Sequence, residues 1–455
     1  MARRTAVTRL PFLQLEAATV LSGAGNGAAL VVLPWIALEL TGSAGSAGLL
    51  AAATAVPLLA SSLVSGTVVD TLGRRATSIV SDLMSGASVA AIPIIAHLVG
   101  LDMPWLIALA VLGAVFDPAG VTARETMLPA AAARAALPLH RANGVHEAVW
   151  GVAFLLGPGI GGVLIAWVGA VPALWFTAVA FLASAVLVAA MRVDDAGRPA
   201  EHHAPDGFWS GTREGLRFVW RDHLLRALLI TTAVLVSVYM PVEGVLLPVE
   251  FEAQQEPGRL GLVVMAMSLG GIAGALGYGL VGRRWRRSAV YRGALVLTGV
   301  FLMVLAALPP FGVMLAASVL IGVAYGPVGP LVNIAMQTRS PEHMRGRVVG
   351  IITSAEYAAG PFGYLIVGAA TERFGVQPTF LDVGATVLAV AVAALAVRPL
   401  DELDRLPEPT EDGDPHGGGT ADAVEAALDL ATSGPLPLLI PPRDPEQLRR
   451  QELPE

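Results

Sequence analysis

The 455-residue sequence contains no cysteine, which excludes a disulfide framework and a thiolate metal site and leaves the redox compartment undetermined. It contains no lysine either, so all 29 of its basic residues are arginines. Charged residues make up only 14% of the chain, whereas hydrophobic residues make up 55% and the mean hydropathy is +0.66. Such a composition cannot supply the water-facing surface of a soluble protein with two or three domains. The sequence therefore predicts a membrane protein.

The sequence also lacks a metal-ligand cluster, a nucleotide-binding loop and a nucleophile elbow. We therefore expect no enzyme activity, no bound metal, no cofactor and no use of ATP as the energy source. The net charge of −7 comes largely from acidic residues in the last fifty positions, while the arginines cluster within the hydrophobic part. Basic charge is thus local, and no nucleic-acid partner is expected.

Twelve apolar runs are long enough to cross a bilayer, since about 20 apolar residues span the hydrocarbon core. The runs cover residues 12–38, 45–68, 77–100, 103–123, 143–168, 170–191, 225–250, 259–281, 289–308, 311–336, 346–370 and 376–397. The first run is too long, and too poor in a small-residue cleavage site, to be a removable signal peptide. We predict an all-α polytopic membrane protein with twelve transmembrane helices and both chain ends on one side.

The loops between these runs alternate sharply in their arginine content. Loops of one set, with the N-terminal segment, carry clusters at 192–226 and 283–292 together with Arg3, Arg4, Arg9, Arg74, Arg75, Arg124, Arg134, Arg141, Arg339, Arg345 and Arg347. The opposite set carries only Arg259 and Arg373. By the positive-inside rule the arginine-rich loops are cytoplasmic. Both termini are therefore predicted to be cytoplasmic.

Two landmarks recur six runs apart at nearly the same separation. Gly73-Arg74-Arg75 after the second run corresponds to Gly282-Arg283-Arg284 after the eighth, and Gly157-Pro158 in the fifth corresponds to Gly360-Pro361 in the eleventh. Such recurrence indicates a duplicated six-helix unit. The predicted organisation is then an N-terminal bundle (1–191), a cytoplasmic linker (192–224), a C-terminal bundle (225–400) and a disordered cytoplasmic tail (401–455), which is rich in Asp, Glu, Pro and Gly.

The stretch "GTVVDTLGRR", residues 66–75, follows the second run. It resembles the loop between helices 2 and 3 of the major facilitator superfamily at every position of that pattern, which here are Gly66, Asp70, Gly73, Arg74 and Arg75. The resemblance implies the major facilitator fold and assigns this loop a charge-relay role that steadies the outward-facing state. An ordinary basic turn that merely obeys the positive-inside rule is the alternative.

The fifth run, "GVHEAVWGVAFLLGPGIGG", is similar to the antiporter motif of that superfamily. The matching positions are Gly144, Gly157, Pro158, Gly161 and Gly162, and Ala153 stands where the motif has a further glycine. Close helix packing and a proline kink explain much of this pattern without antiport.

Three further stretches, "LPWIALELTGS", "FDPAGVTARETMLP" and "PEHMRGRVVG", are similar to the branch that contains enterobactin exporters and macrolide efflux proteins. The resemblance covers residues 10–398. One departure concerns the intramembrane arginine that many proton antiporters carry in helix 4. We expect it to be absent here, with Arg124 at or beyond the end of that helix.

Ionisable residues inside the runs are site candidates, because a charge in hydrocarbon costs at least ~2.5 kcal/mol and so faces a cavity or a partner. Glu356 lies near the middle of the eleventh run, Glu147 in the inner half of the fifth and Glu243 in the outer half of the seventh. Burial favours the protonated form of a carboxyl group, so each is a candidate proton carrier. Alternatively, each hydrogen-bonds a neighbouring helix or reaches an aqueous vestibule.

Polar, uncharged residues are candidates for the substrate cavity. Asn26, Asn333 and Gln337 would line it if the usual superfamily arrangement of helices 1, 4, 7 and 10 holds. Asp117 precedes Pro118 at the inner end of helix 4 and could cap a broken helix, and His97 is expected at the outer interface.

These features predict a monomeric secondary transporter of the cell membrane that exports small amphipathic organic compounds by alternating access, with protons as the coupling ion. Two alternatives stay open. One is an importer or uniporter of the same fold. The other is a non-transporting membrane sensor or scaffold that acts through its tail.

Overall fold

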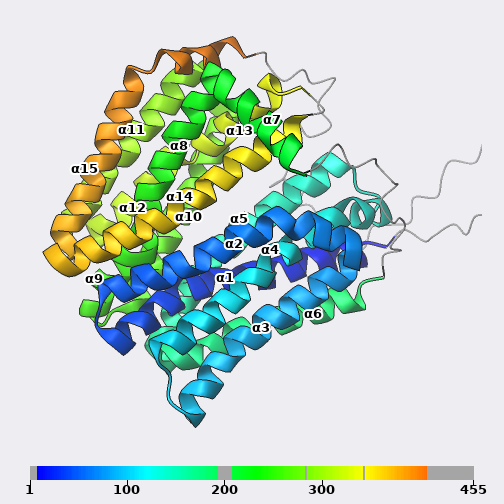
Figure 1. Cartoon of the computed structure of the whole chain (residues 1–455), viewed down its shortest axis with the longest axis vertical. Coiled ribbons are helices and arrows are strands. Elements are labelled where there is room, and N and C mark those ends of the chain that lie inside the picture. The colour runs from blue at the N-terminus through cyan, green and yellow to red at the C-terminus, as the bar shows by residue number, and fades with distance from the viewer. Residues whose placement is uncertain (1–7, 193–207, 282–283, 342–343, 407–455) are drawn as a thin grey trace, which may run out of the picture.

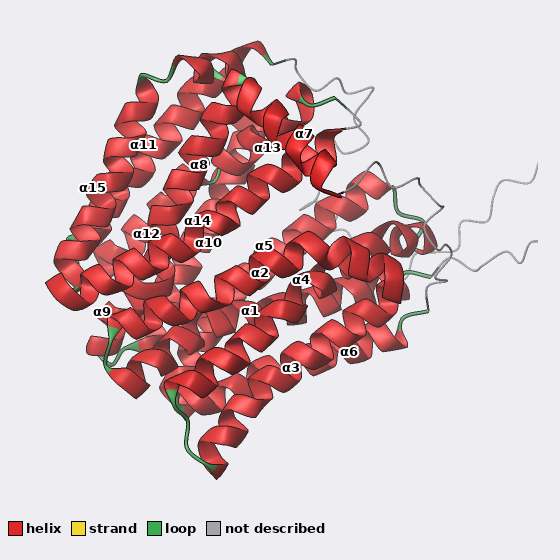
Figure 2. Ribbon diagram, in the orientation of Figure 1, coloured by secondary structure: helices red, strands yellow, loops and turns green. Residues whose placement is uncertain are grey.

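The computed structural model of the chain describes residues 8–192, 208–281, 284–341 and 344–406. The secondary-structure elements of this described part are all helices, joined by short loops, and it contains no strand (Figure 2). The predicted all-α class is therefore confirmed. The first half contains α1 (Leu10–Thr41), α2 (Ala44–Leu72), α3 (Arg74–Leu98), α4 (Met103–Arg134), α5 (Leu139–Val168) and α6 (Ala170–Ala190).

The second half begins after the short helix α7 (Phe208–Arg221). It contains α8 (His223–Pro241), a π-helical turn η1 (Val242–Leu246), α9 (Leu247–Ala253), α10 (Pro257–Val281), α11 (Arg287–Ala306), α12 (Phe311–Tyr325), α13 (Val328–Arg339), α14 (Arg345–Phe374) and α15 (Val376–Leu395), and it ends in a 3-10 helix η4 (Arg398–Arg405). Two predicted runs are thus divided: 225–250 into α8, η1 and α9, and 311–336 into α12 and α13.

Eleven candidate spans in the described part of the chain are long and apolar enough to cross a membrane. The predicted run 346–370 corresponds to α14, which is not among the eleven. This helix carries Arg345, Arg347, Glu356, Glu372 and Arg373, which lower its hydropathy. The presence of membrane-spanning helices is confirmed, while the count of twelve and the cytoplasmic location of the termini stay predictions.

Two turns of the same conformation occur six predicted spans apart in the chain. Gly169 (φ 88°) joins α5 to α6, and Gly375 (φ 90°) joins α14 to α15. Each glycine has a positive φ that other residues adopt at a cost, and each precedes a proline by three residues. A Cβ on Gly169 would lie 3.8 Å from Cδ of Pro172, and a Cβ on Gly375 would lie 3.8 Å from Cδ of Pro378. The two turns therefore have the same local geometry.

Helices α1–α6 pack against one another, and helices α8–α15 do the same, so the chain forms two bundles side by side (Figure 1). The main contacts between the bundles are α2 with α14 and α5 with α10. Each bundle has one end that carries the arginine-rich turns, and we call this the arginine-rich end. The opposite end holds the turns after α1, α3, α5, α9, α11 and α14.

The arginine predicted to lie outside helix 4 lies inside it. Helix α4 continues to Arg134, well beyond the predicted end at residue 123, and Arg124 is 1% exposed. The apolar run stops near residue 123 because charged side chains follow, but the backbone stays helical since the Arg124 charge is balanced internally by Asp82. The expectation that no intramembrane arginine occurs in this helix was therefore wrong.

Large apolar side chains are exposed around the two bundles. Trp167 is 80% exposed, Phe362 71% and Ile366 68%. An apolar surface of this kind marks a membrane contact, because soluble proteins rarely expose contiguous apolar patches of such extent. The lipid bilayer is thus the environment that this surface fits.

The 3-10 helix η4 is attached to the start of α11. The carboxylate of Asp404 accepts hydrogen bonds from the Ser288 backbone N–H (2.9 Å) and hydroxyl (2.7 Å) and from Arg286 (3.0 Å). Partial burial alone would raise the pKa of Asp404, but these hydrogen bonds outweigh it and lower the pKa below its ordinary value. The attachment is therefore kept at neutral pH and weakens as the pH falls into the acidic range. The remainder of the predicted tail, 407–455, lies outside the described residues.

Candidate functional site

A cavity of about 280 Å³ is formed mainly by the first bundle, on the side that faces the second. Its wall comes mostly from α1, α2, α3, α4 and α6, and it is completed by Met240, Gly244, Gly360 and Tyr364 of the second bundle. Most of the lining is aliphatic or aromatic. A concave apolar site with few polar groups is typical of binding sites for small organic molecules.

The main polar feature of this cavity is a pair formed by Asn26 of α1 and Asp117 of α4. The Asn26 amide donates a hydrogen bond of 2.8 Å to Oδ1 of Asp117. Asn26 thus lies at the cavity, as predicted for it, whereas Asp117 contributes a carboxylate to the wall rather than a helix cap. This carboxylate provides one place where a positively charged group of a bound molecule would be stabilised.

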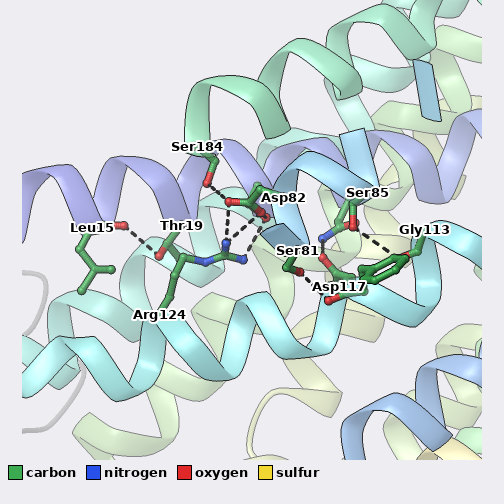
Figure 3. Close-up of polar contacts among 12 residues, drawn as sticks. Leu15, Thr19, Ser81, Asp82, Ser85, Gly113, Asp117, Arg124 and Ser184 are labelled. Carbon is green, nitrogen blue, oxygen red and sulfur yellow. Dashed lines mark hydrogen bonds and ion pairs between the residues drawn. The ribbon is translucent and has the colours of Figure 1, made fainter. Parts of the chain in front are cut away.

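A buried ion pair lies beside Asp117 in the first bundle (Figure 3). The Arg124 guanidinium donates to both carboxylate oxygens of Asp82, at 3.0 and 3.1 Å, and a second guanidinium nitrogen donates to the Ser22 hydroxyl at 3.0 Å. Ser184 donates to Oδ2 of Asp82 at 2.7 Å. The network therefore joins α1, α3, α4 and α6.

A second buried polar pair lies closer to the arginine-rich end. His146 of α5 is 5% exposed and Glu16 of α1 is 6% exposed. Nδ1 of His146 lies 3.1 and 3.2 Å from the two carboxylate oxygens of Glu16. The pair connects α1 with α5, two helices of the same bundle.

The two bundles meet closely at the end opposite to the arginine-rich end. A Cβ on Gly48 of α2 would lie 2.5 Å from the backbone oxygen of Tyr364 and 3.1 Å from Cα of Gly368. Ser43 also donates a hydrogen bond of 3.0 Å to Glu372. Contact between backbones is possible here only because the positions lack side chains.

The helices that meet at this end diverge toward the other. In Figure 1 the two bundles lie closest at this end and are farther apart toward the arginine-rich end. We call the touching end the sealed end. The cavity thus lies between a sealed end and an end where the bundles are farther apart.

The predicted helix-5 motif divides between two partners. Gly157 and Gly161 pack on α1, where a Cβ would lie 2.7 Å from Cα of Gly27 and 2.9 Å from the Ala28 oxygen, respectively. Gly162 packs against the second bundle, where a Cβ on Gly162 would lie 2.5 Å from the backbone oxygen of Pro257 of α10. Two further motif positions, Gly144 and Pro158, lie in α5.

The departure from this motif at Ala153 has a structural counterpart. A Cβ on Gly23 of α1 would lie only 2.8 Å from the Cβ of Ala153. The glycine that the motif lacks in α5 is therefore supplied by the facing helix.

The predicted switch loop lies at the arginine-rich end. Gly73 has a φ of 87° at the junction of α2 and α3, and Arg75 donates a hydrogen bond to the Ala189 oxygen of α6. Arg74 is half-buried and Asp70 is exposed, and Asp70 forms no ion pair with another described residue. Among the described residues, the contacts of this loop stay within the first bundle.

The remaining predicted residues do not meet at one site. Glu147 of α5 is exposed, and Glu243 lies in η1, where its Oε1 accepts a hydrogen bond of 3.3 Å from Tyr239. Glu356 lies in α14, and its side chain is outside the described part. Asn333 and Gln337 are exposed on α13 and do not line the cavity described above, because α13 lies toward the arginine-rich end, beyond the break after α12.

Comparisons with known proteins agree with this geometry. A family model described as "Transmembrane secretion effector" matches residues 7–435. The Multidrug efflux pump Tap of Mycolicibacterium fortuitum is 44% identical over 408 residues, which cover 89% of this chain and 100% of that protein. Macrolide efflux protein A of Streptococcus pyogenes is 21% identical over 351 residues, covering 74% and 84%. The crystal structure of the nucleoside transporter NupG has a TM-score of 0.66 at 12% identity, covering 85% and 98%.

Proposed function

The chain belongs to the transmembrane secretion effector family of major facilitator transporters, and we propose that it exports small amphipathic organic compounds from the cell in exchange for protons. It is a multi-pass membrane transporter rather than an enzyme. We place it in the cell membrane with both termini in the cytoplasm, as a monomer. The work of transport is done by alternating access, in which the two bundles rock about the cavity.

The observation that carries this proposal is the apolar cavity with its Asp117–Asn26 pair, lined by both bundles, beside the end where backbones of the two bundles touch. An apolar wall binds the hydrophobic body of a substrate, and a carboxylate in that wall favours a cationic group. The relatives named as efflux pumps support export over import. With the termini cytoplasmic, the bundles are open to the cytoplasm here, which is the side from which an exporter loads.

Proton exchange requires groups that bind protons inside the spans. Glu356, Glu147 and Glu243 are retained as candidate carriers, and the switch loop and the helix-5 motif are proposed to act in the change between conformations. The buried Asp82–Arg124 network supports the same proposal, because an ion pair in hydrocarbon marks a functional pathway more often than a stabilising contact.

The proposal is tested by efflux from cells that express the protein, using a panel of lipophilic dyes and antibiotics with and without an uncoupler. We expect energy-dependent efflux of several compounds, abolished by the uncoupler. Accumulation driven by the protein would indicate import instead, and uncoupler-insensitive equilibration would indicate uniport.

Asp117→Asn is expected to reduce efflux of permanently cationic dyes by about tenfold, which corresponds to the loss of about 1.4 kcal/mol of binding free energy. Efflux of neutral compounds should change little, since the amide keeps the shape of the side chain and its contact with Asn26. Dose–response curves for one cationic and one neutral dye of similar size measure this. An equal loss for both dyes would show that Asp117 serves folding or coupling rather than substrate charge.

Deletion of residues 407–455 is expected to leave efflux unchanged. The cut preserves η4 and Leu406, whose backbone oxygen accepts a hydrogen bond of 2.9 Å from Arg287. Efflux rates of the truncated and full-length proteins at equal abundance give the answer. Loss of the cellular phenotype with intact flux would favour the scaffold function of the tail.

A further inference from the structure

Helix α1 presents three polar residues in succession to the other helices of its bundle. Asn26 contacts Asp117 at the cavity, Ser22 contacts the Asp82–Arg124 pair, and Glu16 contacts His146. At a rise of 1.5 Å per residue, the second contact lies about 6 Å from the first along the helix, and the third lies about 9 Å further. A series of ionisable groups therefore leads from the cavity toward the arginine-rich end.

The Glu16–His146 pair differs from the others in one respect. The Asp82 carboxylate has a permanent counter-charge in Arg124, whereas Glu16 faces an imidazole that is either neutral or charged. Nε2 of His146 is buried and has no hydrogen-bond partner among the described residues. When Nδ1 carries the hydrogen that is donated to Glu16, Nε2 keeps a lone pair that can accept a proton.

The surroundings of His146 are apolar on one side and acidic on the other. Phe12 and Leu15 of α1 and Val145 of α5 belong to the buried apolar cluster around the pair. Glu125 of α4 and Glu147 of α5 are close enough to interact electrostatically with His146, and both are exposed. Glu125 interacts electrostatically with Arg124 as well as with His146 and Glu147. The groups facing His146 are therefore one buried and two accessible carboxylates.

These positions permit a simple proton balance. When Nδ1–H donates to the Glu16 carboxylate and Nε2 is bare, the buried pair carries one negative charge. A proton that leaves the carboxyl group of Glu125 or Glu147, or a hydronium ion, and bonds to Nε2 creates an imidazolium–carboxylate pair with no net charge. Release of the same proton restores the starting state. One proton is bound and released, and no other bond changes.

We propose that the Glu16–His146 pair is a proton-binding site of this transporter, loaded from the cavity when the cavity opens at the opposite end and emptied at the arginine-rich end through Glu125 and Glu147. The inference rests on the proposed proton exchange and assigns it to a particular pair. Because the pair joins α1 to α5, and α5 forms the crossing with α10, its protonation acts on a helix that takes part in sealing the cavity.

The test uses the full-length protein in lipid vesicles with ethidium as the probe, because ethidium keeps its positive charge at every pH used. Two fluxes are measured: uphill transport driven by an imposed pH gradient, and downhill equilibration without a gradient over about pH 5 to 8. The variants are His146→Gln and Glu16→Gln. The matched control is His97→Gln, which removes an exposed histidine at the end of α3.

For His146→Gln we expect loss of gradient-driven transport by about a hundredfold, as for removal of a proton-transferring group, with downhill flux retained and its pH dependence flattened. Glu16→Gln should shift the pH dependence of downhill flux to lower pH, because the carboxylate favours the imidazolium. His97→Gln should behave as wild type.

Gradient-driven transport by His146→Gln at the wild-type rate would overturn the assignment. If His146→Gln loses both fluxes, the Glu16→Gln variant provides the test. A Glu16→Gln protein that transports ethidium with the wild-type pH profile would also overturn the assignment. Wild-type vesicles that equilibrate ethidium but do not respond to the pH gradient would instead refute the proposed proton exchange.

Discussion

Replacing Gly48 by valine is expected to abolish efflux almost completely while the protein still inserts and folds. The valine Cβ would lie 2.5 Å from the backbone oxygen of Tyr364, and backbone atoms of α14 cannot move aside as a flexible side chain can. Overpacking of this kind costs about 1–3 kcal/mol, and occasionally more. Since about 1.4 kcal/mol is tenfold in an equilibrium, up to about a hundredfold fewer molecules would reach the conformation with the sealed end.

The matched control for this variant is Gly293→Val. Gly293 lies within α11, and a Cβ there would meet no atom within 4 Å. This control makes the same residue change within a helix, so it measures the effect of valine on helix propensity without a clash between the bundles. We expect Gly293→Val to transport at close to the wild-type rate, and equal losses in both variants would show that valine acts through helix formation alone.

Accessibility of the cavity gives an independent measurement of the Gly48→Val effect. A single cysteine introduced as Thr54→Cys at the cavity wall has no background, because the natural chain has no cysteine. A membrane-impermeant thiol reagent added at the sealed end should label this cysteine slowly in the otherwise native protein and faster with Gly48→Val. Equal labelling of the two proteins would show that Gly48 does not control closure of that end.

Arg124→Gln is expected to lower stability strongly, by about 3–5 kcal/mol, because removal of one partner leaves a buried charge uncompensated. Asp82 would keep only the hydroxyls of Ser184 and Ser22, and it is 1% exposed. Thermal unfolding of the purified protein in detergent, followed by tryptophan fluorescence, measures the change. An exposed arginine of α7 provides the control as Arg213→Gln, for which we expect no shift in the unfolding temperature.

The double variant Asp82→Asn, Arg124→Gln separates the charge from the packing. Two neutral side chains of similar shape can hydrogen-bond each other, so we expect the double variant to be more stable than Arg124→Gln alone. The coupling free energy of such a contacting pair should be about 0.5–3 kcal/mol. Additive losses would mean that the two side chains stabilise the bundle separately, against the geometry of the network.

Hydropathy was sufficient to predict the helical membrane fold, since apolar length is a property of the chain alone. It failed at Arg124, because the run of apolar residues ends where the charge begins, whereas the helix continues to Arg134. Only the structure shows that Asp82, distant in sequence, compensates this charge. The extent of a span therefore depends on a tertiary contact that composition does not record.

The site was predicted in part. Asn26 lies at the cavity, but Glu16, Asp82 and His146 were not selected, although all three are ionisable residues within apolar runs. The criterion that selected Glu147 would have found them. What it could not supply is the pairing of each residue, because helix rotation decides whether a side chain faces a partner, the cavity or lipid. Glu147 is exposed, whereas the adjacent His146 is buried.

The crossing at Gly48 and Gly368 consists of backbone in contact with backbone, without an ion pair between these positions. Such a contact draws its strength from dispersion. The hydrogen bond beside it, from Ser43 to Glu372, pairs a carboxylate with an uncharged hydroxyl, so no ion pair among the described residues has to be broken. Ionic strength should therefore have little influence on how easily that face of the molecule opens. The bundles can therefore separate at that end without breaking an ion pair between described residues. The charged groups deeper inside the first bundle then determine when this separation occurs in the transport cycle.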